Sequence, residues 1–488
     1  MKKFCIVLFM CFNVSGFAQD TLSLTLFEVI RLAKDSSLAA FRQKNMYLAD
    51  YWTFRNYKAD LLPSLSLQTT PVSYSRQLVS RYDSNSDMDV YRQQRSFSTL
   101  GSLTLTQNFL PLGGYFYVNT GVEFLRYFGD NTFNQFSAIP VIIGYRNDIL
   151  GFNQLRWNRK IEPLKFEKAK AEYVYNIEKI SLSALQYFFA LAEAQFKYEN
   201  ALRQVEKSDS LLVMGKRKFE IAAVSSSDLI SLELDVVSAK NVVMTSEIAV
   251  KRAEMNLVSY LGLKRGTKLS LIIPKKPQKI EIPLSKAVEM MKENNYLIKE
   301  KIEGVLNAEM TLDKTNKTTR FSASVSASVG YNQQAEKFKD VYKDPMRRDV
   351  VSLSLNIPLI DWGSGRGSRN IAKNNLEIAK TDEKQKIDEL EQTVIVTVGE
   401  LEARFVLMES ALTALEMAQR VYAMNIERFK NASCDIAALN SSQQRLQTAQ
   451  NEYLTAMSGY WSCLYELRTL TLYDFETGKT ITEETDLF

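Results

Sequence analysis

Residues 225–260 read SSSDLISLELDVVSAKNVVMTSEIAVKRAEMNLVSY, and residues 435–470 read DIAALNSSQQRLQTAQNEYLTAMSGYWSCLYELRTL. In both stretches apolar residues recur every seven positions, and the two series are separated by a constant offset of 210 residues. The first series is Leu229, Val236, Val243, Val250 and Leu257, and the second is Leu439, Leu446, Tyr453, Tyr460 and Leu467. This heptad repeat predicts two copies of one unit, built from long helices that pack as coiled coils.

The segments that precede these stretches follow the same offset. Ile177, Ile180 and Ala184 correspond to Ile387, Leu390 and Val394. A helix over residues 153–218 would be about 100 Å long at ~1.5 Å per residue. Each copy would then turn back at a tip, near residues 219–229 and 429–439. The helices alone fit a tube wall and a plain four-helix bundle equally well.

Between the helices lie stretches with the two-residue period of β-strands. Residues 321–331 read FSASVSASVGY, so one face of the strand is apolar and the other is almost entirely serine. Residues 351–359 alternate in the same way. A polar face, an apolar face and aromatic ends are typical of strands in an outer-membrane barrel, but they also fit an ordinary sheet over a soluble core.

The first copy has a longer β region than the second. Residues 29–38 resemble residues 288–297 at an offset of 259, whereas the helices after the strands are offset by 210. The difference, 259 − 210 = 49, indicates an insertion of about 49 residues, in which we expect a hairpin of residues 97–107 and 115–127. This predicts four strands in the first copy and two in the second, with the polar stretch 80–94 as a loop on the outer side.

The predicted fold class is α+β, with long coiled-coil helices and β-strands arranged as a tandem repeat. The predicted segments are a first repeat at 19–263 with its β region at 63–148, a linker at 264–283, a second repeat at 284–469 with its β region at 320–359, and a carboxy-terminal tail at 470–488.

The amino terminus predicts export. Residues 1–3 are Met-Lys-Lys, residues 4–12 are mainly apolar, and Gly16-Phe17-Ala18 follows with small residues. This is the pattern of a secretory signal peptide over residues 1–18. Beyond it no apolar run reaches the ~20 residues of a spanning helix, so a membrane would have to be crossed by strands.

Composition argues against an enzyme and against nucleic-acid binding. The chain contains no histidine, which removes the commonest general base and the commonest metal ligand. It also lacks a Gly-rich phosphate loop and a hydrolase serine motif, so we expect no catalytic, cofactor-binding or metal-binding residue. The formal net charge of +5 is mild and spread along the helices. Cys434 and Cys463 would lie about 40 Å apart on one helix, outside disulfide reach.

In its tandem repeat and several short motifs, the mature chain resembles the TolC family of outer-membrane efflux proteins. The motifs are the Leu62-Pro63 junction from helix to strand, the run NIPLIDWG at residues 356–363, and the two tips. The resemblance implies a homotrimer in the cell outer membrane, whose strands close one barrel while its helices form a tunnel across the periplasm. Six strands in each chain would give 3 × 6 = 18 strands, and barrels above about 16 strands leave an aqueous lumen.

The resemblance also implies partners. Family members passively conduct substrates from an inner-membrane pump and a periplasmic adaptor protein, in tripartite efflux or type I secretion. Outer-membrane lipid is the other implied partner. The tips are the implied adaptor contact, and the family's Gly positions are occupied here by alanines. The adaptor-contact candidates are Ala222, Ala223, Val224, Ser225, Ala432 and Ser433.

The family further implies a gate at the tips, where this sequence departs from the family pattern. The gate Asp of the family is matched by Asp228, but its Tyr partner is replaced by Phe429 and a nearby Arg by Cys434. Arg428 is an alternative partner for Asp228. Asp228 and Asp435 also suit helix N-termini, where acidic residues are favourable. The gate candidates are Asp228, Arg428, Phe429 and Asp435.

A different class of protein fits part of the same pattern. An exported periplasmic coiled-coil scaffold without channel activity would have the same leader and helices, and its strands would form a small soluble sheet.

Overall fold

The computed structural model describes residues 21–84, 87–128, 132–149, 151–220, 225–430 and 436–481, so the predicted signal peptide lies outside the described residues. The chain divides into two compact units. The helical unit comprises Met1–Met46, Ala171–Asn295 and Leu390–Phe488, and the sheet unit comprises Tyr47–Lys170 and Tyr296–Glu389.

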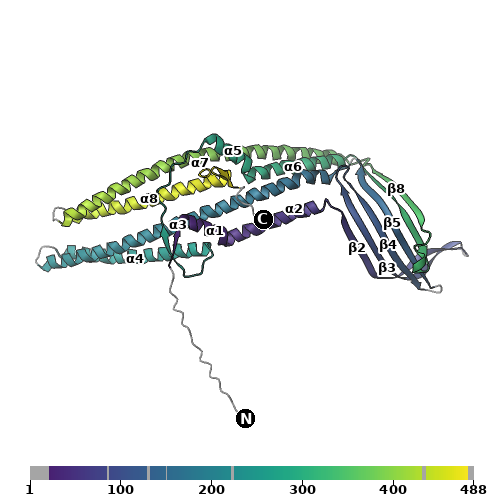
Figure 1. Ribbon diagram of the computed structural model, residues 1–488, viewed down its shortest axis with the longest axis horizontal. Helices are drawn as coiled ribbons and strands as arrows, with labels where there is room; N and C mark the ends of the chain where they lie inside the picture. Colours follow the sequence, from purple (N-terminus) through teal and green to yellow (C-terminus); the bar gives the residue numbers. More distant parts are fainter. Residues whose placement is uncertain are drawn as a thin grey trace, which may run out of the picture. The chain divides into compact units, whose positions relative to one another are not determined.

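Four long helices supply most of the helical unit. α3 (Gln154–Glu220) and α7 (Ser364–Lys430) each have 67 residues, and they begin and end 210 positions apart, as the offset predicts. α4 (Ser226–Tyr260) runs back along α3, and α8 (Ile436–Thr471) runs back along α7, giving two helical hairpins (Figure 1). The predicted long helices are therefore present in both copies.

The heptad series explains how these hairpins pack. Every residue of both series is buried or half-buried, with Val236 and Leu257 fully buried in α4 and Tyr460 and Leu467 in α8. Burying an aliphatic side chain of this size stabilises a fold by about 1.5–3 kcal/mol. Cys463 fills a buried position beside this series, and burial raises the pKa of its thiol to about 11.

Short elements tie the amino-terminal segment to the middle of the chain. β1 (Thr21–Thr25) pairs in parallel with β6 (Lys268–Ile272), which lies inside the stretch predicted as a linker. α1 (Leu26–Ser36) then starts from a capping box in which Thr25 and Glu28 satisfy each other's backbone N–H groups. The remaining elements of this unit are α5 (Leu284–Asn294), β9 (Tyr473–Asp474), β10 (Lys479–Thr480) and the first residues of α2 (Leu38–Ala59).

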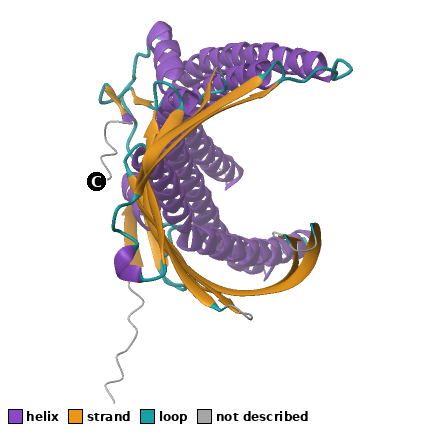
Figure 2. Cartoon of the chain, turned by 90° about the vertical axis from the view of Figure 1, so that its right-hand side faces the viewer, coloured by secondary structure: helices purple, strands orange, loops and turns teal. Residues whose placement is uncertain are grey.

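The sheet unit is built on one antiparallel sheet of six strands in the order β2-β3-β4-β5-β7-β8. The sheet is strongly curved (Figure 2), and β2 and β8 form its two edges. α6 (Tyr296–Thr318) leads into its second-repeat strands, and the short helix η1 (Phe338–Asp340) lies between them. The strands are β2 (Ser64–Asp83), β3 (Met88–Phe109), β4 (Gly114–Phe128), β5 (Phe133–Ile149), β7 (Ser322–Ala335) and β8 (Met346–Asn356).

Two strands of the first repeat are longer than the sequence predicts. The prediction of a loop over residues 80–94 is wrong, because β2 continues to Asp83 and β3 begins at Met88. Ser80 pairs with Tyr91 and Tyr82 with Asp89 in an unbroken antiparallel ladder. Backbone hydrogen bonds sustain a strand there without the apolar alternation that a sequence pattern detects.

The two repeats join where β5 and β7 approach closely at Gly330. A Cβ added at Gly330 would lie 2.3 Å from the Val141 carbonyl oxygen and 2.7 Å from Ile142 Cα, next to a register shift in β5. Both contacts are with backbone, which cannot rotate away. At Gly101 in β3, by contrast, an added Cβ would meet no described atom within 4 Å.

We therefore expect Gly330→Val to push β5 away from β7 and destabilise the sheet by about 3 kcal/mol, the upper range for overpacking. Urea unfolding in detergent, followed by far-ultraviolet circular dichroism, would measure this loss. Gly101→Val is the matched control and should unfold like the parent protein. Equal midpoints for the two variants would contradict the close approach at Gly330.

Candidate functional site

One face of the six-stranded sheet is apolar from edge to edge. The register places Leu65 and Leu67 of β2 opposite Leu105 and Leu103 of β3, and it continues this face across the other strands. In the edge strands these side chains are open, with Leu67 71% and Leu353 61% exposed. Representative residues of the apolar face, one from each strand, are Leu65, Leu103, Val118, Ile143, Val329 and Leu353.

The opposite face of the same sheet is polar. Asn119 of β4 lies opposite Thr104 of β3 and donates a hydrogen bond from Nδ2 to Thr104 Oγ1 at 2.7 Å. Ser326 and Ser328 of β7 pair with Arg146 and Gly144 of β5 on this face. A sheet with one hydroxyl-rich face and one exposed apolar face suits a boundary between water and hydrocarbon.

The helices have a different composition. Across the described residues, no helix combines the length and the apolar character needed to cross a bilayer. In the same residues, no group of three or more acidic or cysteine side chains is placed to hold a metal ion.

At the first tip, Asp228 is the third residue of α4 and forms a capping box with Ser225. Asp228 Oδ2 accepts hydrogen bonds from Ser225 Oγ at 2.7 Å and from the Ser225 N–H at 3.3 Å, while the Asp228 N–H donates to Ser225 Oγ at 3.1 Å. These hydrogen bonds lower the pKa of Asp228. The carboxylate is exposed, so it presents a charge to solvent at the start of α4.

The other tip candidates divide into two groups. Arg428 and Phe429 belong to the last turn of α7, and Ser225 precedes α4. The remaining candidates lie outside the described residues, and they are Ala222, Ala223, Val224, Ala432, Ser433 and Asp435.

Close to the first tip, α3 and α4 pack tightly around a glycine. A Cβ added at Gly215 of α3 would lie 2.4 Å from Leu232 Cδ1 of α4. Lys216 and Glu233 form an ion pair across the same two helices at 3.8 Å. The first tip therefore sits on a closely packed helix pair.

A polar groove of about 880 Å³ lies between α3, α4 and α8. Its wall includes Lys207, which donates a hydrogen bond to Gln443 Oε1 at 2.9 Å, and burial lowers the pKa of Lys207. Within the described chain, the side-chain oxygens of Asn440 and Asn451 in this wall are buried without a hydrogen-bond partner. A groove of this size and polarity suits bound water.

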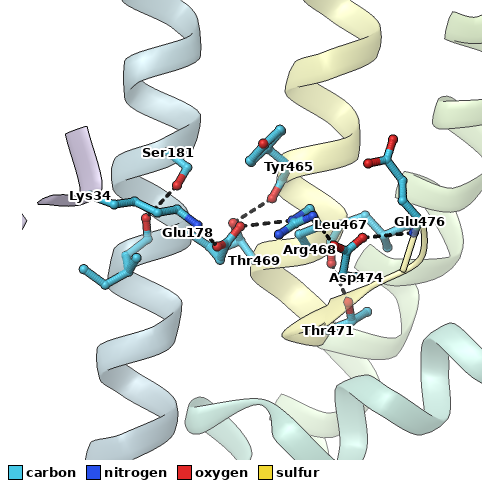
Figure 3. Close-up of polar contacts among 11 residues, drawn as sticks. Lys34, Glu178, Ser181, Tyr465, Leu467, Arg468, Thr469, Thr471, Asp474 and Glu476 are labelled. Atoms are coloured by element: carbon cyan, nitrogen blue, oxygen red, sulfur yellow. Dashed lines mark hydrogen bonds and ion pairs between the residues drawn. The ribbon is translucent and has the colours of Figure 1, made fainter. Parts of the chain in front are cut away.

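A buried ion network joins four elements of the helical unit (Figure 3). Glu178 of α3 is fully buried and pairs with Lys34 of α1 at 2.6 Å and with Arg468 of α8 at 3.1 Å. Arg468 also pairs with Asp474 of β9 at 2.9 Å. Burial acts to raise the pKa of Asp474, but the Arg468 charge and local hydrogen bonds hold that pKa below its usual value.

The sequence analysis did not identify this network. The available signal is a charge on a buried helix face, because Glu178 shares helical spacing with the buried residues Val174, Ser181 and Leu185. Its partners could not be inferred, because Lys34 is 144 residues and Arg468 is 290 residues distant in sequence.

Solved structures with the same architecture are outer-membrane channels. The chain is similar to the CmeC outer membrane channel of Campylobacter jejuni, with 14% identity, a TM-score of 0.64 and coverage of 94% of this chain and 89% of that chain. It is also similar to the outer membrane protein VceC of Vibrio cholerae, with 14% identity, a TM-score of 0.61 and coverage of 92% of this chain and 95% of that chain. It is similar as well to CusC, with 12% identity, a TM-score of 0.62 and coverage of 91% of this chain and 91% of that chain. At these identities the likeness shows a shared fold.

Residues 318–471 match the outer membrane efflux protein family. The match covers most of the second repeat and confirms the resemblance predicted from the sequence. Members of the family are channels, which confirms the prediction that the chain is not an enzyme. A comparison with curated protein sequences finds no match.

The buried network generates a stability prediction. Glu178→Gln should destabilise the helical unit by about 3 kcal/mol, because it leaves Lys34 without its partner and Arg468 with only Asp474. Thermal unfolding in detergent, followed by helical circular dichroism, would measure the loss.

The matched control for this variant is Glu193→Gln. Glu193 pairs with Lys197 on the exposed surface of the same helix, so its loss should cost less than about 0.5 kcal/mol. If both variants melted at the parent temperature, Glu178 would have no stabilising role.

Proposed function

We propose that three copies of this chain form an outer-membrane channel-tunnel, which passively conducts substrates outward in a tripartite efflux or type I secretion system. The observation that carries the proposal is the two-faced sheet with its exposed apolar side. The match to the outer membrane efflux protein family and the likeness to outer-membrane channels support it.

The edges of the sheet support assembly from several copies. Within the described residues, β2 and β8 are each paired on one side only. Hydrocarbon offers no partner to an open strand edge, so β8 of one copy would pair with β2 of the next. Three copies would then supply 3 × 6 = 18 strands, enough for a water-filled lumen. The extra hairpin of β3 and β4 would widen the barrel relative to one of twelve strands.

A second apolar surface supports side-by-side packing of the helices. Large apolar residues on α4 remain exposed in the single chain and recur at heptad spacing on a side other than the buried series. They include Ile230, Leu234, Val237, Met244, Ile248 and Met255, which are 55–70% exposed. A neighbouring copy would cover this stripe, and the helices of three copies would then form the tunnel wall.

The remaining parts of the proposal concern partners and export. The leader over residues 1–18 would direct the chain out of the cytoplasm, and the repeats at 19–263 and 284–469 would form the assembly. The tips would contact a periplasmic adaptor through Ser225 and the neighbouring candidate residues. An inner-membrane pump would supply the driving force, since members of the family are channels.

The direct test is extraction of the full-length protein from membranes, followed by gel electrophoresis with and without heating and by planar-bilayer recording. We expect detergent-dependent solubility, a trimer that dissociates on heating, and ion conductance. A monodisperse soluble monomer in the absence of detergent would contradict the proposal and favour the exported coiled-coil scaffold.

The role of Asp228 in gating can be tested in the same recordings. If its charge holds the closed state, Asp228→Ala should raise the open probability, whereas Ser225→Ala should not, because it removes the cap but keeps the carboxylate. Asp235→Ala, an exposed change on the same helix, is the control. An unchanged closed state in Asp228→Ala would remove Asp228 from the gate.

A further inference from the structure

Three arginines lie on neighbouring strands of the apolar face, beyond its aliphatic part. Arg76 of β2 is directly opposite Arg95 of β3. Arg95 pairs with Phe128 of β4, so Arg126, two residues before Phe128, lies diagonally across from Arg95. The alternation of each strand places the three on the same face as Leu103, and all three are exposed. We refer to Arg76, Arg95 and Arg126 as the arginine cluster.

In the part of the chain that the structure describes, the arginine cluster has no counter-charge of its own. Among the described residues, no carboxylate lies within ion-pair distance of these three side chains, whereas Arg347 on the same face pairs with Asp349 at 2.8 Å. With its amide oxygen turned toward Arg76, Gln93 accepts hydrogen bonds from Nε at 2.8 Å and Nη2 at 2.9 Å, but this acceptor is neutral. Like charges directly opposite each other destabilise a sheet, so an anion would relieve the cluster.

The position of the arginine cluster along the strands matches a membrane boundary. Arg76 follows Leu65 by 76 − 65 = 11 residues, which is about 36 Å of strand and ~28 Å of depth at a tilt of ~40°. The apolar band of outer-membrane barrels is ~25 Å tall. Arg76 lies in the half of β2 that is remote from α2, which in the proposed assembly is the level of the outer headgroups.

An aromatic row lies immediately below the arginines. Tyr74 is opposite Phe97, and the rings of Phe97 and Phe124 meet edge to face with centroids 6.3 Å apart. Each of these residues precedes or follows an arginine of the cluster by two positions, and so shares its face. Aromatic side chains at this height are typical of the boundary between headgroups and acyl chains.

We propose that the arginine cluster binds the phosphate of an anionic lipid headgroup in the outer leaflet, with the lipid's acyl chains against the aromatic row and the aliphatic residues below. Guanidinium groups bind phosphate through paired hydrogen bonds. A free phosphate ion would engage the arginines alone, whereas a lipid engages both surfaces. This inference rests on the proposed membrane-spanning assembly.

The test uses the purified full-length trimer in detergent at low salt and measures the temperature at which it dissociates. Three additions are compared, namely phosphatidic acid, phosphatidylcholine with the same acyl chains, and inorganic phosphate. Phosphatidic acid should raise the dissociation temperature by about 3 °C more than phosphatidylcholine does. Arg95→Gln should reduce this difference by at least half, and the double variant R76Q/R95Q should abolish it. Arg348→Gln, on the polar face of β8, should retain it.

Each outcome has a distinct meaning. The same response in R76Q/R95Q as in the parent protein would overturn the lipid site, and a full response to inorganic phosphate would indicate an adventitious ion only. Heat-sensitive migration and bilayer conductance are recorded on the same samples. If the parent protein conducts as a trimer without a response to phosphatidic acid, only the lipid site fails. If no trimer forms, the proposed function fails and the lipid site fails with it.

Discussion

A strand edge in hydrocarbon cannot leave its backbone N–H and C=O groups without partners, and in the proposed assembly this constraint would govern the sheet unit. β8 has 11 residues, about the length that crosses a bilayer, whereas its counterpart edge β2 has 20. In the proposed assembly, pairing with β8 of another copy would therefore satisfy β2 only over its first half. The second half, which begins near the arginine cluster, would need water or headgroups around it. Edge length would thus set both how the proposed barrel closes and the depth at which polar residues become acceptable.

The helical unit is built from a duplicated helical hairpin, α3–α4 and α7–α8. α3 and α7 match in length to the residue, so in the proposed tunnel the two repeats would occupy equivalent places in one wall. The copies nevertheless differ at the buried network, because Arg468 corresponds to the uncharged Val258 at the same offset, and Asp388, the counterpart of the buried Glu178, is exposed. Among the described residues, the buried ion network therefore occurs in one copy and not in the other.

How much could be inferred from the sequence depended on the range of the interactions. Local periodicity was sufficient for α3, α7 and the serine-rich strand β7, because each residue's face is set by its own neighbours. It failed for the outer part of β2 and β3, where the ladder alone maintains the strand. It also missed the parallel pair of β1 and β6 and the partners of Glu178, since both depend on residues more than a hundred positions apart. At the first tip, the serine at position 225 was enough to suggest that Asp228 takes part in a helix cap. The structure contains the corresponding capping box between Ser225 and Asp228.

The strand order has a consequence for the time course of folding. β2 to β5 form a meander in which each strand pairs with the next, so their contacts close over short loops. The pairing of β5 with β7 instead joins Ile142 to Gly330, a separation of 330 − 142 = 188 residues that includes the whole first helical hairpin. Contacts between residues so far apart in sequence form late, because closing the long intervening loop costs conformational entropy before the contacts can stabilise the fold. The first-repeat meander can thus be complete while its β5 edge is still unpaired, and that open edge is the surface most prone to pair with another chain during folding.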